Sequence, residues 1–167
     1  FLCVPSRNVI KLPGSVDNEM GAILDPYGNA VHAALSFDLV GEDVLITGAG
    51  PIGIMSAAIA LHVGARKVLI TDINDDRLSL AKSVCDVETL NPSKENLKEK
   101  MKHMGLKEGF DIGLEMSGSE SALDQMIDSM LMGGKVALLG LPSDSINLDL
   151  PKLIFKALTL KAIYGRE

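Results

Sequence analysis

A glycine-rich run, Gly48-Ala49-Gly50-Pro51-Ile52-Gly53, stands directly between two regular patterns. Before it, Val44–Thr47 is a short β-branched and aliphatic run typical of a buried strand, and after it Ile54–Val63 has the apolar spacing of a helix. A strand, a turn of the form G-x-G-x-x-G and a helix, in this order, are typical of a dinucleotide-binding loop. We therefore predict that the backbone amides at this helix start bind a pyrophosphate.

Each glycine of this run has a separate expected task. Gly48 permits the tight turn, Gly50 lets the backbone approach the pyrophosphate, and Gly53 lets the helix pack closely on the strand. Pro51 is tolerated in the first helical turn. Glycine-rich turns also occur for structural reasons alone, so the prediction depends on the flanking strand and helix and on an acid farther along the chain.

That acid is Asp72, which ends the second predicted strand 19 residues beyond Gly53. An acid at about this spacing binds the adenosine ribose diol in dinucleotide-binding folds. Asp is also a good helix cap, so capping of a helix from Asn74 onward is the competing interpretation. A carboxylate at the ribose would repel the 2'-phosphate of NADP, by about 4 kcal/mol per charge pair at ~4 Å and an effective dielectric constant near 20, which favours NAD.

Arg77 follows Asp72 by five residues on the next predicted helix. Its charge could partly offset the repulsion of NADP. Three interpretations of its position stay open instead: it could lie against the adenine, pair with Asp72 or be a plain surface arginine.

From Val44 onward, apolar runs of strand length alternate with helical patterns, as in βαβ units on a parallel sheet. The predicted strands are Val44–Thr47, Lys67–Thr71, Phe110–Glu115, Lys135–Leu139 and Leu158–Ile163, with Val87–Leu90 at an edge. The predicted helices are Pro51–Val63, Asn74–Val84, Lys94–Met104 and Ser119–Met132. Several strands are continuously apolar, which indicates cover on both faces. We expect an α/β fold: a doubly wound, parallel, six-stranded Rossmann sheet with helices on both faces.

The composition excludes several classes of protein. A net charge of -6 opposes nucleic-acid binding, which needs a clustered basic face. The apolar stretches are interrupted before the roughly 20 residues of a membrane span, and no signal peptide opens the chain, so we expect no membrane association and a cytoplasmic location. Cys3 and Cys85 lie far apart, and the three histidines lack the spacing of a helical metal motif, so we predict no complete metal site.

Both ends of the chain suggest a piece of a longer protein. Residues 1–16 do not fit the βαβ rhythm and are expected to be a lead-in from a missing catalytic domain, whereas residues 17–167 are expected to form the Rossmann domain. The last residues, Tyr164 to Glu167, directly follow a strand-like run.

Three runs carry a family resemblance: Asp25–His32, Gly48–Gly53 and the terminal Ile163–Glu167. Together they closely resemble the zinc-dependent medium-chain dehydrogenase family, and within it the branch that oxidises threonine. The likeness covers essentially the whole chain. The glycine motif is shared by the entire superfamily, whereas the first and last runs are more selective and favour threonine over a generic alcohol.

The resemblance implies oxidation of L-threonine at its hydroxyl carbon, with hydride passing to NAD and 2-amino-3-oxobutanoate as product. It also implies a catalytic zinc in the full-length parent, with most zinc ligands, the proton-relay residues and a structural zinc in a domain preceding this chain. The chain alone is therefore expected to bind NAD without catalysis. A homo-oligomer, a tetramer in the parent, is expected through the edge of the dinucleotide sheet.

The resemblance also implies further site residues. Besides the motif glycines, the implied NAD contacts are Ile52, Asp72, Arg77, Leu139, Gly140, Leu141, Ile163 and Tyr164. Those after the fifth and sixth strands also fit the rule that doubly wound sheets bind ligands beyond the carboxyl ends of their strands, where Gly140 leaves room for the nicotinamide half. Ordinary strand-end turns are the alternative.

Asp25 is the candidate for the chemistry itself, because Pro26 after it indicates a helix break. The residues alone leave a turn or cap role equally open. The resemblance implies that Asp25 faces the catalytic zinc and joins the proton relay or approaches the metal. His32, two helical turns on, could share that face or be a satisfied buried histidine.

Two other functions stay open. One is the NAD domain of a related zinc polyol or secondary-alcohol dehydrogenase, and the other is a non-catalytic NAD-binding module.

Overall fold

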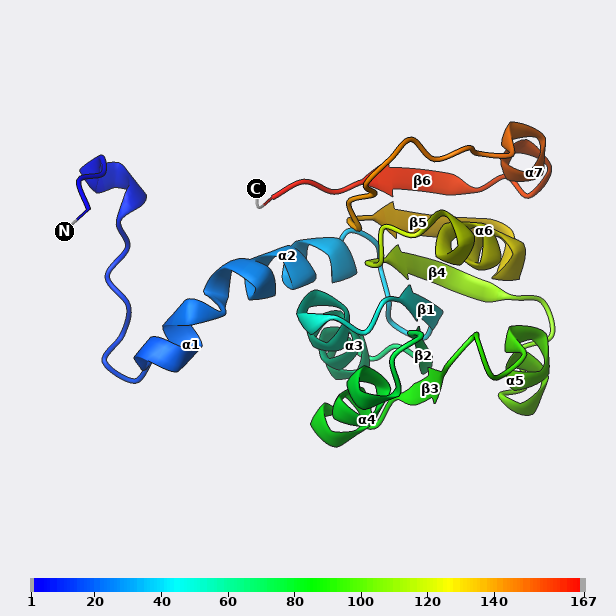
Figure 1. The fold of residues 1–167 in the computed structure, drawn as a ribbon, viewed down its shortest axis with the longest axis horizontal. Helices are drawn as coiled ribbons and strands as arrows, with labels where there is room; N and C mark the ends of the chain where they lie inside the picture. The colour runs from blue at the N-terminus through cyan, green and yellow to red at the C-terminus, as the bar shows by residue number, and fades with distance from the viewer. Residues whose placement is uncertain (1, 166–167) are drawn as a thin grey trace.

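The predicted strands form a single parallel sheet in the computed structural model, which describes residues 2–165 (Figure 1). The strands are β1 (Asp43–Thr47), β2 (Lys67–Thr71), β3 (Glu88–Leu90), β4 (Phe110–Glu115), β5 (Met130–Leu138) and β6 (Thr159–Ala162). Their order is β3-β2-β1-β4-β5-β6, and every neighbouring pair is parallel. The predicted doubly wound α/β fold is confirmed. Phe1, Arg166 and Glu167, which belong to the expected lead-in and the C-terminal run, lie outside the described residues.

The central strands β1, β2 and β4 are buried on both faces, and their side chains alternate between two apolar clusters. Val44 and Ile46 of β1 pack in one cluster, and Leu45 between them packs in the other. The parallel register places Val44 beside Val68 of β2 and Ile112 of β4, so the three central strands share this alternation. Continuous apolar runs in the sequence therefore correspond to strands covered on both sides.

Helices cover each face, as predicted. The first cluster includes side chains of α2 (Leu24–Ala34), α3 (Pro51–Val63) and α4 (Asp75–Val84). The second includes side chains of α5 (Leu97–His103) and α6 (Glu120–Ser129). The boundaries of α3 match the prediction, whereas α5 begins three residues late because Asn96 caps it and accepts hydrogen bonds from the backbone nitrogens of Lys98 and Glu99.

The predicted end of the fourth helix is wrong. Helix α6 ends at Ser129, and β5 begins at Met130 rather than at Lys135, so Met130 to Met132 are strand residues. The ammonium of Lys156 donates to the backbone oxygens of Ile127, Asp128 and Met130 at 2.7–2.9 Å. These bonds satisfy carbonyls at the helix end, and the chain passes directly into the strand.

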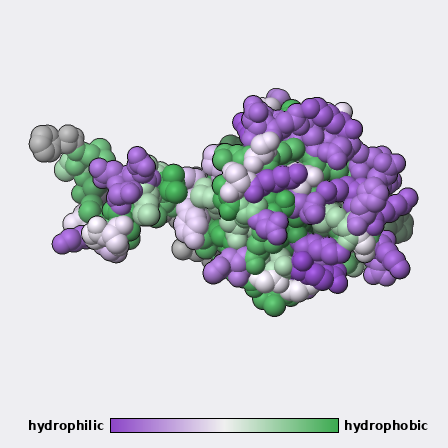
Figure 2. All heavy atoms as spheres, turned by 90° about the horizontal axis from the view of Figure 1, so that it is seen from below, coloured by the Kyte–Doolittle hydropathy of each residue, from purple (hydrophilic) through white to green (hydrophobic). Residues whose placement is uncertain are grey.

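Four helical elements of the described residues are not among the predicted helices: η1 (Ser6–Asn8), α1 (Asn18–Ala22), α2 and α7 (Leu150–Phe155). The first two form an arm that leads away from the sheet (Figure 1). Apolar side chains lie exposed along this arm, as Figure 2 shows, among them Leu2, Val9 and Ile10. Within residues 2–165, no helix has both the length and the apolar character needed to cross a membrane.

Candidate functional site

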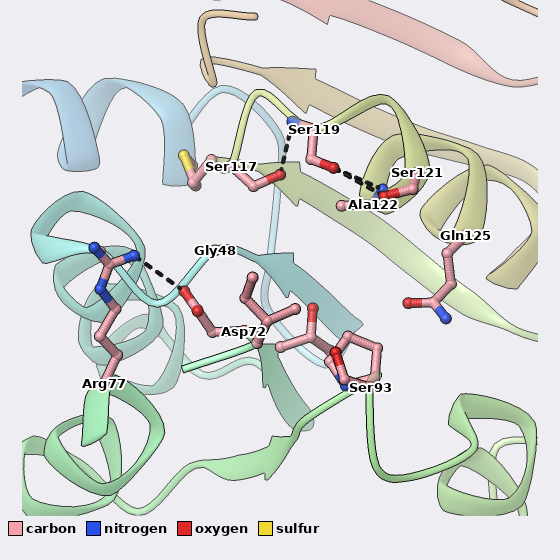
Figure 3. A pocket seen from close by; sticks show the side chains of 14 residues that line it. Gly48, Asp72, Arg77, Ser93, Ser117, Ser119, Ser121, Ala122 and Gln125 are labelled. Atoms are coloured by element: carbon pink, nitrogen blue, oxygen red, sulfur yellow. Dashed lines mark hydrogen bonds and ion pairs between the residues drawn. The ribbon is translucent and has the colours of Figure 1, made fainter. Parts of the chain in front are cut away.

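A cavity of about 520 Å³ opens at the carboxyl ends of β1, β2 and β4 (Figure 3). This is the point where the order of the strands reverses, since β1 has β2 on one side and β4 on the other. In doubly wound sheets this switch point is the usual ligand site. The cavity is lined by Gly48, Gly50, Thr71, Asp72, Ile73, Arg77, Pro92, Ser93, Met116, Ser117, Ser119, Ser121, Ala122 and Gln125.

The glycine loop forms one wall of this cavity. Gly48 follows β1 with φ of 91°, a left-handed conformation that favours glycine. Gly50 is the N-cap residue of the 13-residue α3, and with no side chain it leaves the first helical amides uncovered toward the cavity. These amides and the positive end of the helix dipole provide a site for an anion such as a pyrophosphate.

The third glycine is required by packing within the chain. A Cβ atom added at Gly53 would lie 1.9 Å from the backbone oxygen of Gly48. By contrast, a Cβ atom added at Gly50 would have no described atom within 4 Å apart from its own chain neighbours. Gly53 is therefore needed because the turn leaves no room for a side chain, whereas Gly50 faces open space.

Asp72 forms the adjacent wall, and its side chain is only 7% exposed. One carboxylate oxygen accepts a hydrogen bond from the backbone nitrogen of Ala49 at 2.8 Å, and the other accepts one from that of Asn74 at 2.9 Å. Asn74 is itself the cap of α4, since its side chain accepts hydrogen bonds from the backbone nitrogens of Asp76 and Arg77. Asp72 is therefore not the N-cap residue of α4.

Arg77 extends from α4 toward the same carboxylate (Figure 3). Its Nη1 atom lies 3.6 Å from Oδ2 of Asp72, and the arginine side chain is 57% exposed. Of the three interpretations of Arg77, the pairing with Asp72 is the one present in the described structure. An exposed guanidinium at the rim of the cavity also remains accessible to a bound nucleotide.

The opposite wall was missed by the sequence analysis. Ser117, Ser119 and Ser121 belong to the turn after β4 and to the start of α6, and Gln125 projects from the next turn of that helix (Figure 3). The signal that could have identified this wall is the polar run from Ser117 to Ser121, because it follows β4, the strand across the switch point from β2. The parallel order of the strands, which brings that run opposite Asp72, is not visible in the run itself.

The other predicted contacts lie outside this cavity. Leu139, Gly140 and Leu141 follow β5, and Ile163 and Tyr164 follow β6, so both segments reach the same carboxyl edge of the sheet. Leu141 and Tyr164 are almost fully exposed, whereas Ile163 is buried and donates a backbone hydrogen bond to Leu138 at 2.9 Å. Ile52, in the first turn of α3, does not line the cavity either.

Asp25 lies in the first turn of α2, directly after the break between α1 and α2 at Ile23. That turn is the end of α2 farther from the sheet, so Asp25 does not line the cavity (Figure 1). The side-chain nitrogen of Asn29 lies 3.4 Å from an Asp25 carboxylate oxygen. His32, on the same helix, has its Nδ1 atom 2.8 Å from the backbone oxygen of Gly165, which ties α2 to the segment after β6.

Metal ligands do not converge in the part of the chain that the structure describes. Residues 2–165 contain no group of three or more His, Cys, Asp or Glu side chains positioned to hold a metal ion. Cys3 and Cys85 are both free thiols, and burial raises the pKa of Cys85. The described residues therefore provide no set of three or more side chains that could hold a zinc ion.

Comparisons with known proteins agree with this geometry. The family model for zinc-binding dehydrogenases matches residues 51–167. L-Threonine 3-dehydrogenase of Ruegeria pomeroyi is 58% identical over 168 residues, which is 100% of this chain and 49% of that protein. L-Threonine 3-dehydrogenase of Shewanella baltica is also 58% identical, over 100% of this chain and 49% of its own length. The chain spans about half the length of the curated relatives it matches.

A solved structure shares the same fold. Galactitol-1-phosphate dehydrogenase from Escherichia coli superimposes with a TM-score of 0.86 at 26% identity, over 98% of this chain and 48% of that one. The family model, the relatives and the switch-point cavity lead to one conclusion. The chain belongs to the zinc-binding dehydrogenase family.

Proposed function

We propose that this chain is the NAD-binding domain of an L-threonine 3-dehydrogenase. The reaction would oxidise the hydroxyl carbon of L-threonine to a ketone, giving 2-amino-3-oxobutanoate, with a hydride passing to NAD and a proton released. The observation that carries the proposal is the position of Asp72 beside the glycine loop, at the rim of the switch-point cavity. Relatives at 58% identity that bear this enzyme's name support the choice of substrate.

The proposed preference for NAD over NADP follows from the same carboxylate. The Asp72 carboxylate is mostly buried and can accept further hydrogen bonds. It has about four acceptor sites, and its partners in the structure are two backbone amides and the Arg77 guanidinium. A ribose hydroxyl could donate to it, whereas the 2'-phosphate of NADP would be repelled. Arg77 at 3.6 Å reduces this repulsion but is largely exposed, so solvent weakens its effect.

The remaining contacts belong to the same proposal. Gly48, Gly50 and Gly53 would set the pyrophosphate beside the amides of α3. Ile52 would contact NAD by resemblance to the family, as would the segments after β5 and β6, which are Leu139–Leu141 and Ile163–Tyr164. Their position at the carboxyl edge supports this assignment.

A role for zinc is proposed only from the resemblance to the family. When bound in the full-length parent, zinc would polarise the substrate hydroxyl. The described residues contain no group of three or more His, Cys, Asp or Glu side chains that could hold this ion. Asp25 is proposed as a proton-relay or near-metal residue of that parent, supported by the resemblance of the run in which it lies.

Domain limits and assembly are also proposals. Residues 17–167 would form the Rossmann domain and residues 1–16 the lead-in, which is supported by the exposure of every described residue before Val16. Strand β6 lies at an edge of the sheet with a mostly exposed run of side chains, which supports assembly of copies, a tetramer in the parent, through this edge. We propose a cytoplasmic location for the enzyme.

A neighbouring activity is the second candidate. Galactitol-1-phosphate dehydrogenase has a closely similar fold at 26% identity, so a polyol or secondary-alcohol dehydrogenase would present the same NAD site. Substrate profiling of the complete enzyme with L-threonine and with polyols separates the two.

Calorimetric titration of the chain with NAD and with NADP tests the proposal. We expect NAD to bind at least about ten-fold more tightly than NADP, a difference of about 1.4 kcal/mol, and we expect L-threonine and NAD to yield no NADH with this chain alone. Absence of binding by a chain whose circular dichroism shows an intact fold would contradict the proposed function.

A further inference from the structure

Glu115 is a buried carboxylate that the proposed function does not use. It ends β4 and is 3% exposed. Its Oε1 atom accepts hydrogen bonds from the backbone nitrogens of Ser117 at 2.8 Å and Gly118 at 3.0 Å. The hydroxyls of Ser117 and Thr47 donate to the same oxygen at 2.5 and 3.3 Å.

These partners explain why an acid occupies this position. All four groups are donors at the contact, and an ionised carboxylate is a side chain that only accepts. A glutamine could turn its one oxygen toward the same donors, but that oxygen carries no negative charge, and hydrogen bonds to a charged group contribute more, about 1.5–3 kcal/mol, than bonds to a neutral one. Its amide N–H₂ would replace Oε2, which lies 3.3 Å from the backbone nitrogen of Gly118, and would face that donor with another donor.

The carboxylate lies where three strand ends meet. Thr47 ends β1, and the Ser117 turn that follows β4 packs on the glycine loop so closely that a Cβ atom at Gly48 would lie 3.0 Å from the backbone nitrogen of Ser117. After β5, a Cβ atom at Gly140 would lie 2.4 Å from Oε2 of Glu115. Gly140 is therefore held close to this carboxylate by packing within the chain.

A chain of hydrogen bonds leads from Glu115 to the cavity wall. The Ser117 hydroxyl donates to Glu115 and accepts a bond from the backbone nitrogen of Ser119 at 3.1 Å. Ser119 caps α6, and its side chain accepts from the backbone nitrogen of Ala122 (Figure 3). Ser117, Ser119 and Ala122 all line the cavity.

We propose that Glu115 is a positioning residue of the dinucleotide site, whose carboxylate holds the Ser117–Ser119 turn as the wall opposite Asp72. This inference rests on the proposed function, because the wall matters only if a dinucleotide fills the cavity. Glu115 acts through the turn and need not touch the cofactor.

The test compares two buried acids at opposite ends of the central strands. Glu115→Gln changes the acid at the carboxyl end, and Asp43→Asn is the matched control at the amino end of β1, where Asp43 is 1% exposed and bound by Arg66. NAD affinity is measured by calorimetry at a temperature where both variants are folded, and the free energy of unfolding is measured separately in urea.

We expect both variants to lose stability and Glu115→Gln alone to lose NAD affinity, by about ten-fold or more. Backbone amide NMR signals of Ser117 and Gly118 should move in Glu115→Gln and stay in place in Asp43→Asn, a signature that general destabilisation does not produce. Unchanged affinity in folded Glu115→Gln, or equal losses in both variants, would overturn the inference while the proposed function stands.

A second variant keeps the test decisive if Glu115→Gln does not fold. Ser117→Ala leaves the carboxylate with three other donors but cuts its link to Ser119. We expect a loss of NAD affinity of about three-fold or more, because the turn loses its hydroxyl link between Glu115 and Ser119, and an unchanged affinity overturns the inference. If the unchanged chain binds no NAD, the proposed function fails and this inference fails with it.

Discussion

The carboxylate of Asp72 accepts a hydrogen bond at 2.8 Å from the backbone nitrogen of Ala49, which lies between the first two glycines of the loop after β1. This bond joins the end of β2 to the loop of the neighbouring strand. The acid that would bind the ribose therefore also shapes the loop that would bind the pyrophosphate. The two halves of the proposed adenosine diphosphate site are therefore joined by a hydrogen bond.

Asp72→Ala should therefore weaken NAD binding by about ten-fold or more, because the ribose loses a charged acceptor. The variant should also lose most of the preference for NAD over NADP, since the like charge facing the 2'-phosphate is gone. Calorimetric dissociation constants for both nucleotides measure these effects. If Asp72→Ala still prefers NAD over NADP as strongly as the unsubstituted chain does, another group sets the preference.

Asn74→Ala is the matched control, since Asn74 caps the helix that follows Asp72. Loss of the cap should lower the free energy of unfolding by about 1 kcal/mol. The ratio of the NAD and NADP dissociation constants should stay within about two-fold of its value in the unsubstituted chain, because the Asp72 carboxylate remains. An equal shift of this ratio in both variants would assign selectivity to the placement of α4.

Gly50→Ala and Gly53→Ala should distinguish an effect on NAD affinity from an effect on the stability of the fold. A methyl group at Gly50 faces the cavity and should reduce NAD affinity on the order of ten-fold or more, at a cost in stability of about 1 kcal/mol or less. A methyl group at Gly53 would meet the backbone oxygen of Gly48 at 1.9 Å, so we expect a loss of about 1–3 kcal/mol or more in stability as well. Urea unfolding and NAD titration of both variants distinguish the two effects, and a stable Gly53→Ala chain would contradict the packing argument.

Much of the fold was predictable because its signals are local. The continuous apolar run at Val44–Thr47 reports burial on both faces, and the helix at Pro51–Val63 is bounded by a glycine turn and by Gly64 in a left-handed conformation. The glycine loop and Asp72 were also predictable, since their spacing reflects one βαβ unit.

The rest depends on contacts between distant segments. The run Met130 to Met132 continues the apolar spacing of the preceding helix, so no local signal ends α6 at Ser129. The last carbonyls of the helix are bound instead by Lys156, which lies far along the chain, after α7. Likewise, the serine wall opposite Asp72 exists because the order of the strands places the turn after β4 there.

The stability of α4 should depend on pH through Asp75. Hydrogen bonds from the Lys94 ammonium and, at 2.7 Å, from the Asn91 amide hold the pKa of Asp75 below its usual value of 3.8. The unfolded chain takes up this proton first as the pH falls. The stabilisation is thus fully present above about pH 4 and is lost as the pH falls through the lower folded pKa.

Asp75→Asn should therefore be less stable than the parent at pH 6, and the difference in the free energy of unfolding should shrink toward pH 2. Urea titrations at a series of pH values measure this difference. In the chain that keeps Asp75, Lys94→Met should move the inflection in the plot of unfolding free energy against pH toward the ordinary pKa of an aspartate, because Lys94 is the main cause of the shift. A difference that stays constant from pH 6 to pH 2 would exclude the ionised form of Asp75 as the source of stability.

Lys156→Met should destabilise the junction between α6 and β5. The variant keeps an apolar stem of similar length but removes the ammonium that binds the carbonyls of Ile127, Asp128 and Met130. Burial lowers the pKa of Lys156, yet a charged donor to three carbonyls still offsets this cost of desolvation. We expect a loss of about 1–3 kcal/mol in the free energy of unfolding.

The matched control is Lys152→Met, one turn earlier on α7. Lys152 pairs with Asp124 and Asp128 on the surface of α6. The lysine side chain is 26% exposed and the two carboxylates are 62% and 49% exposed, so solvent weakens both pairs. Lys152→Met should therefore leave the urea midpoint almost unchanged, while Lys156→Met lowers it and speeds amide hydrogen exchange at the last turn of α6. Equal midpoints for the two variants would mean that α6 ends at Ser129 for a reason other than the Lys156 contacts.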